Sequence, residues 1–311
     1  MLNRPEPNRP EPNRPEPNRL RGLILMVGAG LCWSMGGLVV RSLTLQDAWA
    51  IVFWRSIFMA LFVAVVLLVL HRRSMLTEVR AIGPAGCVAA LCLAAQIYLF
   101  ILSLRNTSTA HTFVLMSISP LVTALAGRLF LGERVVWTTW VAIGVALAGI
   151  GVMFGGGFAA QSERAHLIGN LFALGIPLAY ACQILAVRQV RGKADAPPNL
   201  LPTILVGGLV AAAPAALLAP SLAASTPDML LLAFMGCIQL GLGCLLMTLA
   251  VPHLRAAEMG LLALLETILA PLWVWLGVGE TPGTGALIGG GMIVGALLVN
   301  GLFSLRHDSR R

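Results

Sequence analysis

Ten long apolar runs divide the chain, and they limit its fold more than any other feature of the sequence. Each run has about 19–24 residues, enough for a helix rising about 1.5 Å per residue to cross the ~30 Å hydrocarbon core of a bilayer. Only short connections separate the runs, so the sequence predicts an all-α integral membrane protein with ten transmembrane helices and no soluble domain. The runs span residues 22–40, 50–70, 81–104, 109–131, 135–154, 167–187, 200–219, 230–251, 256–276 and 283–303.

Composition and charge agree with this class of protein. Hydrophobic residues make up 58% of the chain and charged residues 11%, whereas soluble domains carry about 25% charged residues. The net charge of +8 does not indicate a nucleic-acid partner, because the arginines lie between apolar runs and form no basic patch on a soluble face. The six cysteines lie inside apolar runs without a CxxC pair, and we interpret them as packing residues.

The N-terminal segment has a different composition. Residues 3–19 repeat the pentad NRPEP, whose prolines disfavour a helix and favour an extended polyproline conformation. We expect residues 1–19 to form a disordered cytoplasmic tail, with a docking motif for a partner as the alternative. At the other end, residues 305–311 are expected to form a short cytoplasmic tail.

The two halves of the chain are related by an internal repeat. A shift of 147 residues places every apolar run of the first half on one of the second without a gap. Each repeat has five helices, so the second enters the membrane from the opposite side, and residues 20–156 and 167–304 are expected to form two inverted repeats. Many secondary transporters have this architecture, with a site near mid-membrane between the halves. The matches include Gly22 with Gly169, Arg41 with Arg188, and Gly132-Glu133 with Gly279-Glu280.

Most of the 21 Lys and Arg residues fall on the side of the membrane that holds the N-terminus. Cytoplasmic loops carry an excess of Lys and Arg, so both termini are predicted to lie in the cytoplasm. The predicted location is the bacterial inner (plasma) membrane.

Two segments resemble the ends of EamA domains. The first contains Ser119-Pro120 and Leu131-Gly132-Glu133, and the second contains Leu265-Glu266 and Gly279-Glu280, each followed by a helix rich in small residues. Two such domains in tandem resemble the ten-helix drug/metabolite transporter superfamily. The resemblance implies a transporter, often an exporter, whose central cavity is lined by the first four helices of each repeat while the fifth helices lie at the periphery.

Five residues are predicted to lie near the midplane and to line this cavity. Glu266 is the sharpest candidate, because an ionisable group about 15 Å deep in an apolar helix is by default a functional candidate. It either binds a substrate amine or carries a proton, or else it is a structural carboxylate bonded to a neighbouring helix. The aromatic candidates either stack on a planar or cationic substrate or pack between helices. The five residues are Trp33, Ser119, Tyr180, Gln239 and Glu266.

Nearby prolines add polar backbone to this site. Pro271 frees the carbonyl of Thr267, and Pro120 frees that of Met116, so we expect a helix kink beside Glu266 and another beside Ser119.

Four further polar residues are weaker candidates. Gln96 offers neutral hydrogen bonds to a substrate. Arg55 either reaches the headgroups, receives an anionic substrate group or pairs with an acid. His111 and Glu258 are repeat mates where helices four and nine begin, and each is either an interfacial residue or a gate or proton relay.

The turns and the small residues receive structural interpretations. Glu133 and Glu280 are expected to stabilise the N-terminus of the helix that follows each of them. Glycines spaced by four residues in the last helix of each repeat permit close helix contact, either within the chain or between the protomers of a homodimer. They include Gly151, Gly155, Gly285, Gly289, Gly291 and Gly295.

Missing motifs limit the function further. The sequence has no GxxxxGK[ST] loop, HExxH, GxSxG or clustered His/Cys set, so we expect no ATP use, no enzymatic activity, no cofactor and no metal. The predicted function is secondary active transport of a small metabolite, such as an amino acid or a similar amine or drug-like compound, by alternating access. Export is expected from the resemblance, with protons as a candidate coupling ion.

Two alternatives stay open. One is an uptake permease for a vitamin or nucleoside-like metabolite. The other is a non-transporting membrane protein, such as a lipid-carrier flippase subunit. The expected partners are a small-molecule substrate, the lipid bilayer, protons and a second copy of the chain.

Overall fold

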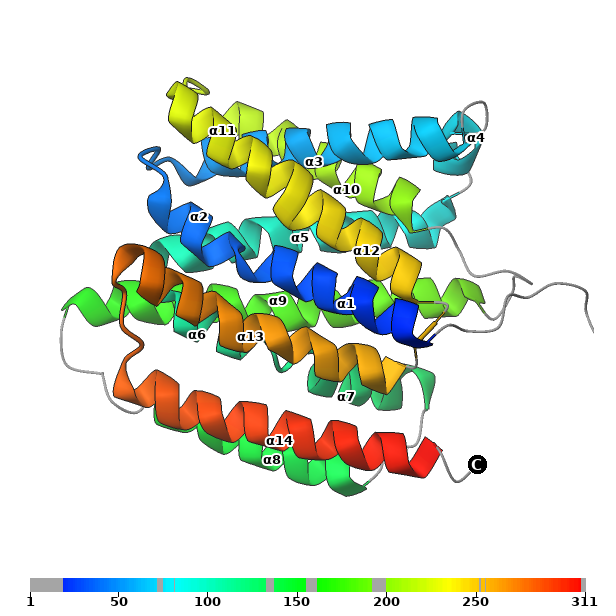
Figure 1. Cartoon of the computed structure of the whole chain (residues 1–311), viewed down its shortest axis with the longest axis vertical. Helices are drawn as coiled ribbons and strands as arrows, with labels where there is room; N and C mark the ends of the chain where they lie inside the picture. The colour runs from blue at the N-terminus through cyan, green and yellow to red at the C-terminus, as the bar shows by residue number, and fades with distance from the viewer. Residues whose placement is uncertain are drawn as a thin grey trace, which may run out of the picture.

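Helices form all the regular structure in the described residues, and they run side by side as one bundle (Figure 1). The start of the first helix and the end of the last lie on the same side, which we call the proximal end; the opposite side is the distal end. The expected tail over residues 1–19 falls, except for Arg19, outside the described residues. The computed structural model describes residues 19–71, 75–80, 82–132, 137–154, 161–191, 200–251, 253–254 and 256–308.

The first repeat contains five helical passes, two of which are interrupted, and a short helix between the second and third passes. The passes are α1 (Arg19–Ser34) with α2 (Gly36–Ser42), α3 (Ala48–His71), α5 (Gly83–Asn106), α6 (Thr109–Met116) with α7 (Ser119–Leu131), and α8 (Trp137–Phe154). The short helix is α4 (Met75–Arg80), which the sequence analysis did not anticipate.

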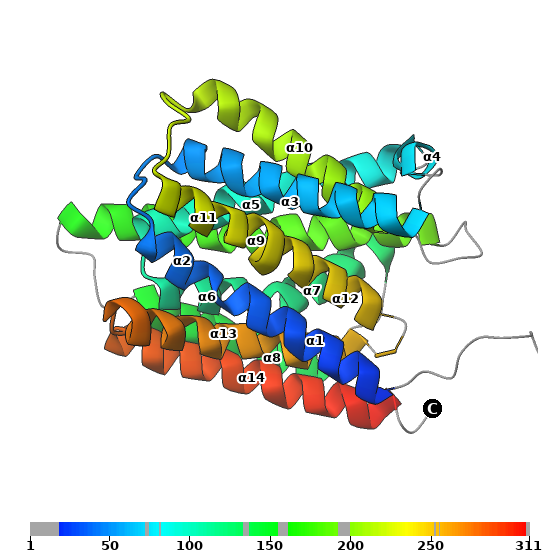
Figure 2. The ribbon, with the colours of Figure 1, turned by 45° about the horizontal axis from the view of Figure 1, so that its top comes forward.

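The second repeat also contains five passes, and its third pass changes helical type in the middle (Figure 2). The passes are α9 (Gln161–Arg191), α10 (Leu201–Leu218), α11 (Thr226–Phe234) with η1 (Met235–Leu242) and α12 (Gly243–Ala250), α13 (Ala256–Val278), and α14 (Thr284–Asp308). Here η1 is a π-helix, whose wider turn bonds each residue to the fifth one before it.

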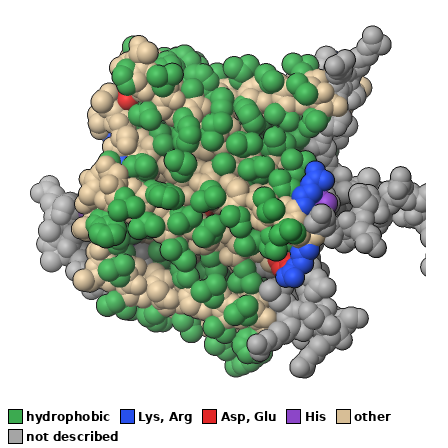
Figure 3. Space-filling view, viewed as in Figure 1, with side chains coloured by type: hydrophobic (Ala, Val, Ile, Leu, Met, Phe, Trp, Pro, Cys, Tyr) green, Lys and Arg blue, Asp and Glu red, His purple; other side chains and the backbone are tan. Residues whose placement is uncertain are grey.

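The predicted fold class is confirmed. Within the described residues, nine helices are long and apolar enough to cross a membrane, and Trp137–Val152 in α8 adds a shorter apolar helix. Large apolar side chains remain exposed on the flanks of the bundle, as on Leu217 (88%) and Phe130 (73%). Figure 3 shows hydrophobic side chains over most of one face, with basic side chains at one end. Such a surface suits contact with lipid tails.

Helix packing follows the repeat. In the first repeat α1 packs against α12 and α13, and the corresponding helix α9 packs against α5, α6 and α7. The second helices of the two repeats, α3 and α10, pack against each other. So do the fifth helices, α8 and α14, which lie together at one edge (Figures 1 and 2). The two repeats are therefore interlocked, with each repeat's first helix embedded in the other repeat.

Two pairs of glycines reproduce this symmetry in atomic detail. A Cβ added at Gly22 would lie 2.7 Å from Cβ of His253, and one added at Gly169 would lie 2.7 Å from the backbone of Asn106 and Thr107. These contacts correspond under the 147-residue shift. A second pair, Gly28 against Leu246 and Gly175 against Leu99, also corresponds. The glycines of the first pair, Gly22 and Gly169, thus allow the first helix of each repeat to contact an equivalent loop, and the two loops lie at opposite ends of the bundle.

The two Gly-Glu turns share a backbone conformation. Gly132 has φ 66° and Gly279 has φ 72°, a left-handed region that residues with a Cβ rarely adopt. Each glycine ends the preceding helix, so this conformation explains why glycine occurs at both matched positions.

The proline-associated breaks differ between the repeats. The fourth pass is interrupted at Ser117-Ile118, just before Pro120, as the sequence predicted. In contrast, α13 continues through Pro271 without a break. A further interruption at Met35, between α1 and α2, was not expected.

The small residues of the last helices contact each other within the chain. A Cβ at Gly149 in α8 would lie 2.7 Å from the carbonyl oxygen of Gly289 in α14, so these two backbones approach closely. By contrast, Gly151, Gly291 and Gly295 have no heavy atom within 4 Å of an added Cβ. The homodimer stays a prediction.

We predict that Gly22→Ala and Gly169→Ala each lower the melting temperature of the purified protein in detergent. The added methyl group would overlap with neighbouring atoms at 2.7 Å, and overpacking typically costs about 1–3 kcal/mol. The matched controls are Gly144→Ala and Gly291→Ala, themselves repeat mates, where an added Cβ meets open space. An unchanged melting temperature for both test variants would contradict the described contacts.

Candidate functional site

The interruption between α1 and α2 brings several helices together. Two glycines follow it, and both pack closely on side chains of other helices. A Cβ at Gly36 would lie 2.9 Å from Nε2 of Gln239, and one at Gly37 would lie 2.5 Å from Cγ2 of Thr109. Glycine at these positions therefore allows α2 to approach the eighth and fourth passes.

Gln239 connects three helical passes. It lies in η1 and is only 3% exposed. Its side-chain oxygen accepts a hydrogen bond from Nη2 of Arg55 at 3.1 Å, and its Nε2 donates to the carbonyl oxygen of Trp33 at 3.2 Å. The amide thus links α3 to α1, and it lies in a π-helix, a feature frequent at functional sites.

Arg55 lies inside the bundle and not at the headgroups. It is 3% exposed, and its guanidinium carbon lies 4.9 Å from the ring centroid of Phe100. Its Nη2 is bonded to Gln239, but its Nε and Nη1 have no hydrogen-bond partner within the described part of the chain. Three N–H donors of a buried cation are therefore unsatisfied.

Glu266 lies on α13 and is half-buried. Its carboxylate forms no hydrogen bond or ion pair with the described residues. By contrast, Asp47 caps α3, the carboxylate of Asp228 accepts hydrogen bonds from Thr44 and Ser225, and Glu280 binds an arginine. The helix of Glu266 packs against α1, whose Trp33 carbonyl is bonded to the amide that holds Arg55, so Glu266 and Arg55 lie on helices that meet at α1.

The aromatic candidates occupy related positions on the first helix of each repeat. Trp33 is half-buried, and its indole Nε1 would lie 2.4 Å from a Cβ at Gly243. Tyr180 is half-buried on α9. Trp33 joins the region of Gln239 through its carbonyl group, whereas Tyr180 lies on α9, which packs against α5, α6 and α7.

The hydroxyl of Ser119 is used within its own pass. Its Oγ donates to the carbonyl oxygen of Met116 at 2.5 Å, which satisfies the acceptor that Pro120 leaves free. Gln96 is also bonded, because its Nε2 donates to Oε1 of Gln183 at 2.7 Å and to the Cys92 carbonyl. Sequence analysis missed Gln183, although an amide in an apolar run is the same signal that identified Gln96.

His111 and Glu258 lie near the ends of the bundle. Nδ1 of His111 is 2.6 Å from Oγ of Ser108, the N-cap residue of α6. Glu258 accepts a hydrogen bond from Nε of Arg19 at 2.8 Å, which connects the proximal ends of α13 and α1. Neither residue contacts Arg55 or Glu266 through an interaction described here.

A network of charged and backbone groups joins the two repeats at the distal end. Nε of Arg41 lies 2.7 Å from Oε2 of Glu280, and its Nη2 donates to the Thr107 carbonyl. Oε1 of Glu280 accepts from the backbone N–H of Thr109 at 2.8 Å. The expectation that Glu280 stabilises the helix following it is therefore corrected, because its carboxylate satisfies the N-terminus of α6 in the other repeat. Glu133 lies outside the described residues.

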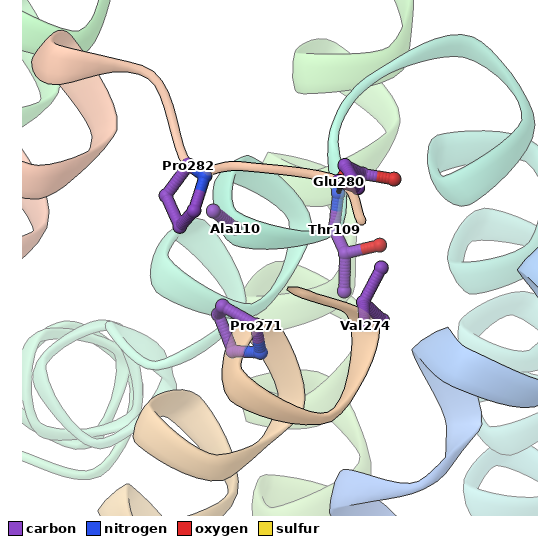
Figure 4. A pocket seen from close by; sticks show the side chains of 6 residues that line it. All are labelled: Thr109, Ala110, Pro271, Val274, Glu280 and Pro282. Carbon is purple, nitrogen blue, oxygen red and sulfur yellow. Dashed lines mark hydrogen bonds between the residues drawn. The ribbon is translucent and has the colours of Figure 1, made fainter. Parts of the chain in front are cut away.

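The two described pockets lie beside this network. The smaller one is lined by Glu280, Thr109, Pro271 and Pro282 among others (Figure 4). The larger one, about 350 Å³, is an apolar groove between α6, α13 and α14. Neither pocket is lined by any of the nine residues that the sequence analysis selected. Their central cavity stays a prediction.

The fold and this site define a class of protein: a polytopic membrane protein built from two inverted repeats, with polar groups buried between them, as in secondary transporters. Residues 20–155 and 167–302 each match the EamA-like transporter family, and the chain belongs to that family. It is therefore a membrane transporter by family, with a substrate and a lipid bilayer as its partners.

The solved structures support the fold alone. Thirteen chains of known structure match this one. One of them, a crystal structure of a protein, has a TM-score of 0.66 and 18% identity, covering 92% of this chain and 99% of its own. No curated protein sequence matches the chain.

We predict a measurable coupling between Arg41 and Glu280. Their side chains are 25% and 26% exposed, so a double-mutant cycle of Arg41→Gln and Glu280→Gln should give about 0.5–1 kcal/mol of the free energy of unfolding in detergent. The matched control is the cycle of Arg19→Gln and Glu258→Gln. Arg19 is 71% exposed, so that coupling should be close to zero. A larger coupling in the control pair would refute this ranking.

Proposed function

We propose that the protein is a secondary active transporter of a small metabolite carrying an amine, and that Glu266 binds either this amine or a coupling proton. The observation that supports the proposal best is the unpaired carboxylate of Glu266, half-buried in an apolar helix. A carboxylate in a bilayer-spanning helix is costly, and such groups usually belong to substrate or ion pathways.

The aromatic residue near this region suits an amine substrate. Trp33 lies on the helix that packs against α13, and an indole face attracts cations. The repeat mate of Glu266 is Ser119, whose hydroxyl is already bonded to Met116. At this matched pair of positions the second repeat therefore supplies a carboxylate and the first repeat only a bonded hydroxyl, which favours a substrate with one cationic end near Glu266.

Alternating access would involve the two ends of α13. At its proximal end Glu258 binds Arg19 of α1, and just beyond its distal end Glu280 binds Arg41 and the N-terminus of α6. Glu266 lies between these contacts. We propose that the distal network opens when the site faces that side, while the interlocked repeats move against each other.

The proposed location is the bacterial inner membrane, with the proximal end and both termini in the cytoplasm. The support is the excess of Lys and Arg on the proximal side. The proposed direction is export, which follows the family resemblance.

We predict that Glu266→Gln lowers substrate flux about tenfold or more, because a hydrogen bond to a charged group contributes about 1.5–3 kcal/mol. The measurement is uptake of radiolabelled L-amino acids and 2-phenylethylamine into proteoliposomes, with and without an imposed pH gradient. Glu266→Asp should retain part of the flux, because it keeps the charge.

The matched control is Glu78→Gln, the same chemical change on α4, outside the candidate spans. It should transport like the wild type. Failure of the wild type to transport any probe would reject the proposed function. Flux that ignores the pH gradient in both wild type and Glu266→Gln would reject proton coupling.

A further inference from the structure

Arg55 is a buried cation that lacks hydrogen-bond acceptors for most of its donors within the described residues. Its guanidinium lies against the ring of Phe100 and the side-chain amide of Gln239, and neither group is anionic. A buried cation without a partner is expensive, so such groups are normally paired with an acid or retained for a ligand.

Four other arginines on the described passes have different surroundings. Arg41 binds Glu280 and Arg19 binds Glu258. Arg105, nearer the surface, donates to the side-chain oxygen of Gln46, and Arg128 lies over the ring of Trp140. Arg55 differs from all four because it is 3% exposed and no carboxylate pairs with it in the described part of the chain.

The neighbouring glycines show that this position is built into the packing. A Cβ at Gly236 would lie 2.6 Å from the carbonyl oxygen of Arg55, and one at Gly208 would lie 3.2 Å from that of Ser56. The eighth pass therefore contacts the α3 backbone directly at Arg55, and the seventh pass contacts it at Ser56. The hydroxyl of Ser56 is also buried, with no hydrogen-bond partner among the residues that the structure describes, which adds a second unsatisfied polar group next to Arg55.

The amide of Gln239 holds the guanidinium in place without neutralising it. It accepts one N–H at 3.1 Å and is itself fixed by donating to the Trp33 carbonyl. The Nε and Nη1 donors have no partner among the described residues, and Gln239 takes only one of the two N–H groups of Nη2. The second N–H of Nη2 can therefore join Nε or Nη1 in the fork with which arginine recognises a carboxylate in a bidentate manner.

We propose that Arg55, positioned by Gln239, binds the carboxylate of the transported molecule, while Glu266 binds its amine. The inference rests on the proposed function and narrows its substrate class to small zwitterions of the amino-acid type. The two charges form no ion pair with each other in the described part of the chain. The amide that holds Arg55 is bonded to the Trp33 carbonyl on α1, and α1 packs against α13, which carries Glu266, so a dipolar molecule between the two charges would satisfy both.

The repeat supports a functional origin for this arrangement. Under the 147-residue shift, Arg55, Gln239 and Glu266 correspond to Pro202, Cys92 and Ser119. At the matched positions α10 packs against α5, as α3 packs against η1, so this helix pair packs there without a charged residue. Arg55 from the first repeat, and Gln239 and Glu266 from the second, therefore have no charged or amide counterpart in the other repeat.

The experiment compares matched probes in proteoliposomes. The probes are the twenty L-amino acids and, for each one transported, the amine that lacks the carboxylate; L-phenylalanine and 2-phenylethylamine are one such pair. The wild type should prefer the amino acid. In Arg55→Gln this preference should fall about 30-fold or more, the loss expected when one partner of a buried charge pair is removed, while transport of the amine persists.

Two further measurements distinguish a role of Arg55 in substrate binding from a role in stabilising the fold. Arg55→Gln removes an uncompensated charge, so the melting temperature of the substrate-free protein should not fall, whereas a structural arginine would lower it. Arg55→Lys keeps the charge but cannot form the bidentate contact, so its preference for the amino acid over the amine should be intermediate. If Arg55→Gln does not fold, the preference of Arg55→Lys tests the inference.

The outcomes are distinct. Transport of amines but of no amino acid, or an unchanged preference in both Arg55 variants, would overturn the inference and leave the proposed function standing. Absence of all transport in the wild type would overturn the proposed function itself.

Discussion

The cost of leaving a polar group unsatisfied in hydrocarbon controls this structure. Backbone amides and carbonyls meet the constraint by forming helices, which is why every regular element in the described residues is helical. Local exceptions obey the same rule: where Pro120 removes a donor, the hydroxyl of Ser119 satisfies the Met116 carbonyl. Against this background Arg55 and Glu266 stand out, because three donors of Arg55 and the carboxylate of Glu266 have no partner within the described residues.

The scaffold is symmetric, but its chemistry is not. Matched glycines, Gly22 with Gly169 and Gly28 with Gly175, form the same contacts in both repeats. Packing therefore constrains the two halves equally, because an added Cβ at either member of a pair meets a neighbouring atom. Side chains that do not define the frame are free to differ, and they do so at Arg55 and Glu266. A recognition site for a molecule with two unlike ends needs this kind of difference.

The fold was predictable from the sequence because its signals are long and repeated. Runs of about twenty apolar residues read directly as spans, and one shift related all five helices of each half. The site was less predictable, since depth in a helix does not determine which face a side chain occupies. Ser119 and Glu266 were predicted to lie at the same depth in the membrane, yet the hydroxyl of Ser119 donates to the Met116 carbonyl in its own pass. The partnership of Arg55 with Gln239 required the packing of α3 against η1, which no local pattern encodes.

Glu280 shows how the repeat and the packing together determine a residue's role. Its sequence position suggested a contact with the helix that follows it, because carboxylates commonly stabilise a nearby N-terminus. The interlocked repeats instead bring the N-terminus of α6 to it, so the same physical preference is satisfied across the boundary between halves. Arg41 then adds a third helix to the contact. The preference of a carboxylate for a helix N-terminus here connects the two repeats. Any motion that separates the repeats at this end must break the contacts of Glu280.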